Sequence, residues 1–153
     1  MPAPLDDAML VAMSTDCACF NLRRATRAVT QLYDQKLGPS GLRVTQVSLL
    51  VALARAGAVP SSRLAEILGM DPTTLSRNLA PLRRAKFLTF TAGRPDRRVK
   101  LVALSAKGRD ALAVAAPLWE AAQRQLTEAL GLERWAALRQ EIGRITSLAG
   151  ATR

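Results

Sequence analysis

The stretch Met70-Asp71-Pro72-Thr73-Thr74-Leu75-Ser76-Arg77-Asn78-Leu79 decides the fold of this chain. Asp71 is a favourable N-cap, and Pro72 suits the first helical position, where its missing N–H removes no helical hydrogen bond. A helix is therefore predicted to begin here. Its apolar positions are Leu75, Leu79 and Leu82. Because their spacing of four and three residues matches the helical repeat, one face of this helix is expected to be buried.

The other face of the helix is short and polar. Residues 61–69 upstream read as another short helix, which ends at a glycine in the C-cap position. Two helices joined by a tight turn form a helix-turn-helix, whose second helix enters the DNA major groove with its N-terminal residues at the base edges. An ordinary helical hairpin is the alternative interpretation.

The segment that follows favours the DNA-binding interpretation. Residues 88–91 alternate apolar and polar side chains, a loop at 93–98 interrupts them, and residues 99–101 resume a strand before Ser105 caps the next helix. Between Asp71 and Arg109 there are ten Lys or Arg and two Asp, a local net charge of +8 out of +10. This concentration of positive charge on one helix and one hairpin is typical of a phosphate-binding surface.

At these positions the sequence resembles the MarR family of winged-helix transcriptional regulators. These are dimeric bacterial proteins that commonly repress genes until a small molecule or an oxidant releases them from DNA. The resemblance rests on residues 64–71, residues 74–77 and the wing signature Asp96-Arg97-Arg98 leading to Leu104-Ser105-Ala106-Lys107-Gly108. It implies a mainly α fold, a winged helix-turn-helix with a helical dimerisation region formed by the first and last helices.

We expect the 153 residues to form a single domain. Residues 42–104 are predicted to form the winged helix-turn-helix lobe, and residues 15–37 and 105–149 the dimerisation helices. In the last helix, large apolar side chains at three-four-three spacing predict a seam that needs a partner helix. They are Trp135, Leu138, Ile142 and Ile145.

Three further structural predictions concern helices. Residues 44–55 read as a strongly apolar helix beneath the DNA-reading pair, with Val47, Leu50, Val51 and Ala54 as its buried stripe. Pro81 and Pro117 each fall inside a predicted helix, where proline removes a hydrogen bond and favours a kink or an early end. For Pro81, tolerance close to a helix end is the alternative. Residues 1–13 carry few signals, and no structure is assigned to them.

Composition narrows the class of function. The chain carries 22 Lys and Arg against 12 Asp and Glu, so an acidic partner is expected, and nucleic acid is the commonest one. It has no histidine, which excludes a Ser-His-Asp triad and most zinc sites. We expect no enzymatic activity, no cofactor and no bound metal. The absence of a long apolar run and of a basic N-terminal start predicts a cytoplasmic protein without membrane contact.

The expected partner is double-stranded DNA, a palindromic operator read by a homodimer. Thr73, Thr74, Ser76 and Arg77 are predicted to face base edges or the nearest phosphates, with Arg77 as the reader of a guanine. Phosphate contacts are assigned to Arg83, Arg84 and Lys100. In the wing, Asp96 is placed to orient Arg98. The resemblance implies that a wing arginine enters the minor groove, and Arg98 matches best, with Arg94 and Arg97 beside it on the backbone.

A signal is predicted to act at Cys17 and Cys19, near the start of the first helix. In a cytosolic protein they are expected to be reduced thiols, and a helix N-terminus with arginines one turn on favours the thiolate. Inert buried cysteines are the alternative. Cys19, with Tyr33 fourteen residues later, resembles the peroxide-sensing branch of the family. In that branch tyrosine hydroxyls hold a reactive cysteine near the dimer core, but this chain has Arg23 where a second tyrosine is expected.

The sequence thus predicts a repressor released by an oxidant or electrophile. Cys17 has no counterpart in that peroxide-sensing pattern. Its thiol could react with a sulfenic acid on Cys19 to form a disulfide, although the side chains of two residues spaced i and i+2 on a regular helix point apart. Capture of a soft metal or metalloid by thiolates of both subunits is the next possibility. Two further alternatives are a small aromatic or carboxylate ligand bound between dimer helices and lobe, and an architectural DNA-binding protein without ligand control.

Overall fold

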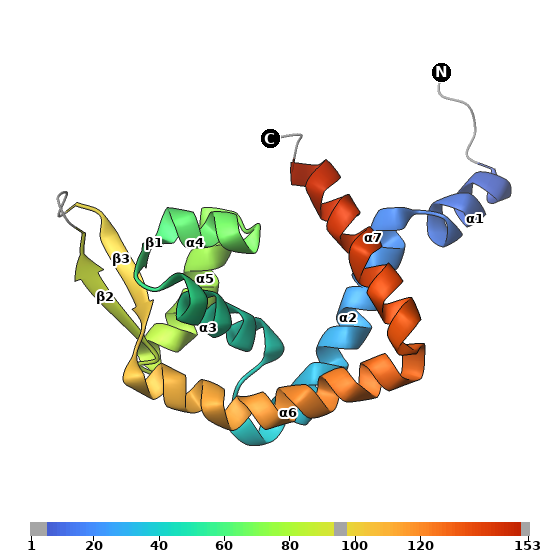
Figure 1. Cartoon of the computed structure of the whole chain (residues 1–153). Helices are drawn as coiled ribbons and strands as arrows, with labels where there is room; N and C mark the ends of the chain where they lie inside the picture. Colours follow the sequence, from blue (N-terminus) through green and yellow to red (C-terminus); the bar gives the residue numbers. More distant parts are fainter. Residues whose placement is uncertain (1–5, 94–97, 151–153) are drawn as a thin grey trace.

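The computed structural model describes residues 6–93 and 98–150 of the chain. Helices dominate, and a small antiparallel sheet accompanies them, so the predicted mainly α winged helix-turn-helix class is confirmed. The elements in chain order are α1 (Asp7–Thr15), α2 (Ala18–Leu37), the 3₁₀ helix η1 (Gly38–Ser40), α3 (Val44–Ala56), β1 (Val59–Pro60), α4 (Ser61–Leu68), α5 (Pro72–Arg84), β2 (Leu88–Ala92), β3 (Lys100–Leu104), α6 (Ala106–Leu130) and α7 (Leu132–Gly150) (Figure 1).

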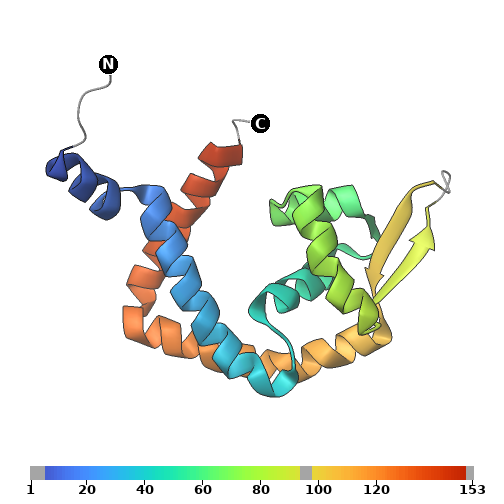
Figure 2. The ribbon, with the colours of Figure 1, turned by 180° about the vertical axis from the view of Figure 1, so that it is seen from behind.

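The chain forms two parts joined by α6. One part, the DNA-reading lobe, contains α3, α4, α5 and the three strands, and the other contains α1, α2 and α7 (Figures 1 and 2). Helix α6 runs along the base of both and packs against α2 and α3. The N-terminal end of α5 and the far end of the β2–β3 hairpin lie toward the same side of the lobe, away from α6.

The sheet has the order β1-β3-β2, and both pairings are antiparallel. The predicted hairpin is present, with Leu88 opposite Leu104 and Phe90 opposite Val102. Strand β1 was not predicted, because it has only two residues and one of them is Pro60, which is too little for an alternating pattern. Val59 pairs with Val102, which is fully buried, so β1 is the third strand of the sheet and packs beside the core of the lobe.

Leucines fill the core of the lobe. The three apolar positions of α5 are all buried, as their spacing predicted. In α3, two of the four residues predicted to be buried are exposed. Val47 and Leu50 are buried, but Val51 is 43% exposed and Ala54 is also exposed, while Leu49 and Leu53 are buried in their place. A helix that is apolar almost all round offers no polar face by which periodicity could identify the buried side.

The N-terminal region differs from the sequence reading. Residues 7–15 form a helix of their own, capped by Asp6, and the next helix starts at Ala18 rather than at residue 15 or 16. Cys17 is the N-cap of α2 and has extended backbone angles. The side-chain amide of Asn21 donates to the carbonyls of Thr15 and Cys17, at 2.7 and 3.1 Å, and so ties α1 to α2.

Neither internal proline ends its helix at once. Helix α5 continues for three residues past Pro81, and α6 continues for thirteen residues past Pro117. Helix α5 thus ends soon after Pro81, and a kink at Pro81 or at Pro117 stays a prediction. Helix α5 then ends in a left-handed residue, Lys86, with φ of 62°. The Lys86 and Phe87 amides donate to the carbonyls of Arg83 and Leu82, the pattern of a Schellman cap.

Lys86 occupies a backbone conformation that costs a residue with a Cβ about 1–2 kcal/mol. Lys86→Gly is therefore expected to raise the free energy of unfolding by about 0.5–1 kcal/mol, part of the gain being offset by the greater freedom of glycine in the unfolded chain. Urea denaturation followed by circular dichroism measures this change. Lys86→Ala removes the same charge and retains the strain, so an equal effect of both substitutions would show that strain is not the cause.

Candidate nucleic-acid interface

The start of α5 is fixed by hydrogen bonds of Asp71. Its carboxylate accepts from the backbone N–H of Thr74 at 2.9 Å and from the Thr74 hydroxyl at 2.6 Å. The hydrogen bonds from the Thr74 side chain and backbone hold the pKa of the Asp71 carboxyl below its ordinary value. Upstream, Gly69 has φ of 61° and ends α4 in a second Schellman cap, so the tight turn is set by local residues at both of its ends.

The predicted base-reading residues lie together on the exposed face of α5. Thr73, Thr74, Ser76 and Arg77 are all exposed, opposite the three buried leucines. The Thr74 hydroxyl donates to the N-cap, so only its lone pairs remain for DNA. Arg77 forms no ion pair with the described residues, so its full set of N–H donors is available.

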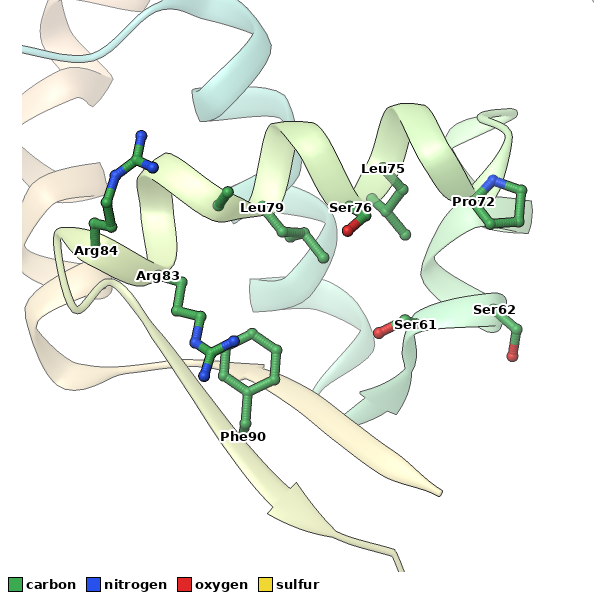
Figure 3. A pocket seen from close by; sticks show the side chains of 10 residues that line it. Ser61, Ser62, Pro72, Leu75, Ser76, Leu79, Arg83, Arg84 and Phe90 are labelled. Carbon is green, nitrogen blue, oxygen red and sulfur yellow. The ribbon is translucent and has the colours of Figure 1, made fainter. Parts of the chain in front are cut away.

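Two of the predicted phosphate-binding residues come close at the other end of α5. Arg83 and Lys100 line one hollow of about 290 Å³, together with Phe90, Thr91 and Ala92 of β2. The guanidinium carbon of Arg83 lies 5.2 Å from the centre of the Phe90 ring. Arg84 points to the opposite side of the helix end (Figure 3).

A larger groove, which we call the α4–α5 groove, lies between α4, α5 and β2 and has a volume of about 590 Å³. It is lined by Ser61, Ser62, Pro72, Leu75, Ser76, Leu79, Ala80, Arg83, Arg84 and Phe90 (Figure 3). The sequence reading missed Ser61, Ser62 and Phe90. The two serines are the first residues of α4, a helix that was predicted. No sequence signal near them indicates that the start of α4 faces the side of α5.

The tip of the wing falls partly outside the described residues. Arg94, Asp96 and Arg97 lie there, so the predicted pairing of Asp96 with Arg98 stays a prediction. Arg98 is exposed just before β3. The backbone N–H of Gly93 donates to the carbonyl of Val99 at 2.7 Å. This hydrogen bond joins the end of β2 to the residues just before β3.

Hydrogen bonds connect the residues that follow α5 to the start of α6. The Ser105 hydroxyl donates to the carbonyl of Lys86 at 2.8 Å, and Lys107 Nζ donates to the carbonyl of Ala85 at 3.0 Å. Gly108 makes the contact possible, because a Cβ at this position would lie 2.4 Å from the carbonyl oxygen of Phe87. The sequence predicted only the cap formed by Ser105, which is present and accepts from the N–H of Gly108.

The predicted sensing residues lie on α2 and at its start. Cys17 is half-buried, and Cys19 is exposed in the first turn. Tyr33 is buried, and its hydroxyl donates to Oε1 of Gln123 in α6. Burial raises the pKa of the Tyr33 hydroxyl. Because fourteen residues of helix span about 21 Å, Tyr33 and Cys19 of one chain do not meet. Cys17 and Cys19 therefore lie at the start of α2, and Tyr33 lies in its last turns, apart from them.

A third hollow lies between α3 and α6. Its volume is about 390 Å³, and its lining residues are Val47, Ser48, Val51, Leu112, Ala116 and Trp119. No lining side chain is charged. This hollow lies where the lobe meets the helix that joins it to the rest of the chain.

Large apolar side chains are exposed outside the lobe. On α7, Leu138, Ile142 and Ile145 are 41–44% exposed, and on α1 and α2 the exposed set is Met9, Leu10, Val11, Met13, Phe20, Leu22 and Val29. In the described part of the chain no single helix is long and apolar enough to cross a membrane. Residues 18–40 (α2 with η1) and residues 44–56 (α3) meet the length and hydropathy criteria only when they are taken together, and a bend of 75° separates them.

Comparison with known proteins agrees with this geometry. Residues 40–99, which include α3, α4, α5 and β2, match the model of the MarR family. No curated protein sequence matches the chain.

Among solved structures, the chain is similar to the Mycobacterium tuberculosis transcriptional regulator MosR in complex with DNA. The two are 41% identical over 90% of this chain and 98% of MosR, with a TM-score of 0.81. The transcriptional repressor CouR bound to a 23-mer DNA duplex is 25% identical over 94% of this chain and 99% of its own, with a TM-score of 0.80. CouR from Rhodococcus jostii bound to p-coumaroyl-CoA is 27% identical over 86% of this chain and 92% of its own, with a TM-score of 0.71. The chain belongs to the MarR family of DNA-binding transcriptional regulators.

Proposed function

We propose that this regulator is a homodimeric repressor that binds a palindromic operator through α5 and the wing. The observation that carries the proposal is the exposed polar face of α5, with Arg77 in its second turn and Arg83 and Arg84 in its last, held rigidly over three buried leucines. A basic, preformed face of this kind suits base edges at the helix N-terminus and phosphates at its C-terminus.

The exposed apolar side chains support the dimer. Helix α7 packs mainly against α6, and Leu138, Ile142 and Ile145 of its seam remain 41–44% exposed in one chain. Burying such side chains contributes about 25 cal/mol per Å² of apolar surface. Dimerisation also sets two copies of α5 on one DNA face, about 34–36 Å apart, as a palindrome requires.

Selection of bound sequences from a random duplex pool tests this proposal. We expect a two-fold symmetric site, two chains per complex by light scattering, and a steep fall of log affinity with log salt concentration. A single chain in solution, or equal affinity for all duplexes, would contradict it. The second result would favour an architectural protein.

We further propose that oxidation of Cys17 and Cys19 releases the DNA. Cys17 lies outside the helix, so a bond between the two sulfurs requires rearrangement of only the first turn of α2. A peroxide would oxidise the Cys19 thiolate to a sulfenic acid, and the Cys17 thiol would then displace water to form the disulfide. This rearrangement would disturb the bonds from Asn21 that join α1 to α2.

One equivalent of peroxide is therefore expected to form the Cys17–Cys19 disulfide and to weaken operator binding at least tenfold, with recovery after reduction by dithiothreitol. Mass spectrometry detects the loss of two hydrogen atoms, and fluorescence anisotropy measures the affinity. Cys17→Ser should accumulate a trappable sulfenic acid, whereas Cys19→Ser should not respond. A parallel titration with arsenite separates thiol oxidation from metalloid capture. Unmodified cysteines with unchanged DNA affinity would exclude both.

The hollow between α3 and α6 favours a second candidate, a regulator that responds to an aromatic ligand. Its lining of Val47, Val51, Leu112 and Trp119 suits an apolar ring, and no lining residue supplies a cation for a carboxylate. A neutral aromatic group therefore fits this hollow better than a free acid. If oxidation and arsenite both leave DNA binding unchanged, this hollow becomes the leading signal site.

A further inference from the structure

The ring of Phe90 occupies an unusual place on the wing. Phe90 pairs across the sheet with Val102, which is fully buried, but Phe90 itself is 39% exposed. The wing extends beyond the lobe core at this point, and only Leu88 of β2 is buried. Phe90 therefore adds little to the core, and its ring faces the last turn of α5 (Figure 3).

The group that covers this ring is the guanidinium of Arg83. The distance of 5.2 Å from Cζ to the ring centre lies within the range of a cation–π interaction. No carboxylate among the described residues forms an ion pair with Arg83. The ring thus restrains a long side chain without neutralising its charge. A carboxylate partner would instead occupy the N–H donors that a phosphate needs.

Arg83 stands at the border of two hollows. On one side is the α4–α5 groove, into which Ser61 and Ser76 turn their hydroxyls (Figure 3). On the other side is the hollow shared with Lys100. Hydroxyl donors and cations on either side of a fixed guanidinium suit the oxygens of a backbone phosphodiester.

We propose that Phe90 is a positioning residue of the DNA interface, which holds the Arg83 guanidinium at the edge of the α4–α5 groove for a backbone phosphate. This inference rests on the proposed DNA-binding function. Its physical basis is preorganisation. An arginine that is already ordered loses less rotamer freedom when it binds, so the same contact yields a higher affinity.

A double-mutant cycle tests the proposal, with the palindromic duplex selected by the wild-type protein as the probe. Phe90→Leu is expected to weaken binding about two- to fivefold for each subunit of the bound dimer, the range of one exposed cation–π contact. Phe90→Tyr retains an aromatic face and should bind like the wild type. Arg83→Ala should weaken binding and lower the slope of log affinity against log salt by about one for each subunit of the bound dimer, whereas Phe90→Leu keeps the charge and hence the slope. In the Arg83→Ala background, Phe90→Leu should have no further effect.

Three results would overturn the proposal. These are an undiminished effect of Phe90→Leu in the Arg83→Ala background, no effect of Phe90→Leu on affinity, or a Tyr variant as weak as the Leu variant. Should Phe90→Leu unfold the wing, the ring-current shift at Arg83 in the wild-type protein decides, because the wild type retains the ring.

The Nε–H resonance of Arg83 in the free protein reports the ring contact directly. We expect a ring-current shift that disappears in Phe90→Leu. If that shift is absent while the duplex still binds, the positioning role fails and the proposed function stands. If the shift is present but the wild type binds no duplex, the proposed function fails and this inference fails with it.

Discussion

Gly108→Ala is expected to destabilise the chain by about 3 kcal/mol, the upper end of the usual range for forcing extra atoms into packed structure. The new Cβ would lie 2.4 Å from the Phe87 carbonyl oxygen and 2.6 Å from Cδ1 of Leu104. The carbonyl cannot move freely, because it accepts the N–H of Ser105 at 3.0 Å. Leu104 is buried and has little room to move. The start of α6 would therefore have to separate from the end of α5.

Urea denaturation measures the loss, and DNA affinity at a temperature where the variant remains folded measures its functional consequence. Gly38→Ala is the matched control, since nothing lies within 4 Å of the added Cβ and φ at this position is −42°. It should change stability by no more than about 1 kcal/mol. A Gly108→Ala protein as stable as this control would show that the junction of α5 and α6 is loosely packed.

Arg77→Ala is expected to weaken binding to the selected operator by about tenfold or more, since a bidentate contact of arginine with guanine contributes about 1–3 kcal/mol. The side chain is exposed on α5 and does not pack in the core, so the thermal midpoint should not change. The loss should also be specific, with relaxed preference at one base pair of each half-site.

Arg139→Ala provides the control for Arg77→Ala, because it removes the same charge from an exposed position on α7, far from the lobe. It should leave operator binding nearly unchanged. If Arg77→Ala weakens all duplexes to the same degree, Arg77 contacts a phosphate and not a base, and the base-reading assignment is wrong.

Most of the lobe could be predicted because its signals are local. The caps at Asp71 and Ser105, the glycine that ends α4, and the leucine spacing of α5 each depend on residues within four positions of one another. The sequence predictions failed where such signals are weak. The break between α1 and α2 occurs at Cys17, which makes no side-chain cap bond, and β1 is too short to show a pattern.

The sequence predicted which types of residue make up the candidate site, but it did not predict how all of them are arranged in space. The exposed face of α5 and the basic residues behind it follow from helical periodicity and charge. In the sequence, Phe90 is one apolar residue of a strand that alternates with polar ones, and this pattern does not indicate a contact with Arg83. Its exposure and its contact with Arg83 depend on how far the wing extends past the lobe.

By itself, the amino-acid sequence determined the helix-turn-helix, the capped start of its second helix and the basic hairpin, because hydrogen bonds between near neighbours and the spacing of leucines specify them. Only the tertiary structure decided which face of α3 is buried, how Lys107 reaches Ala85 from 22 residues away, and where Arg83 meets Phe90. These features join segments that are distant in the chain, and packing selects such contacts from many arrangements that local propensity leaves equally open.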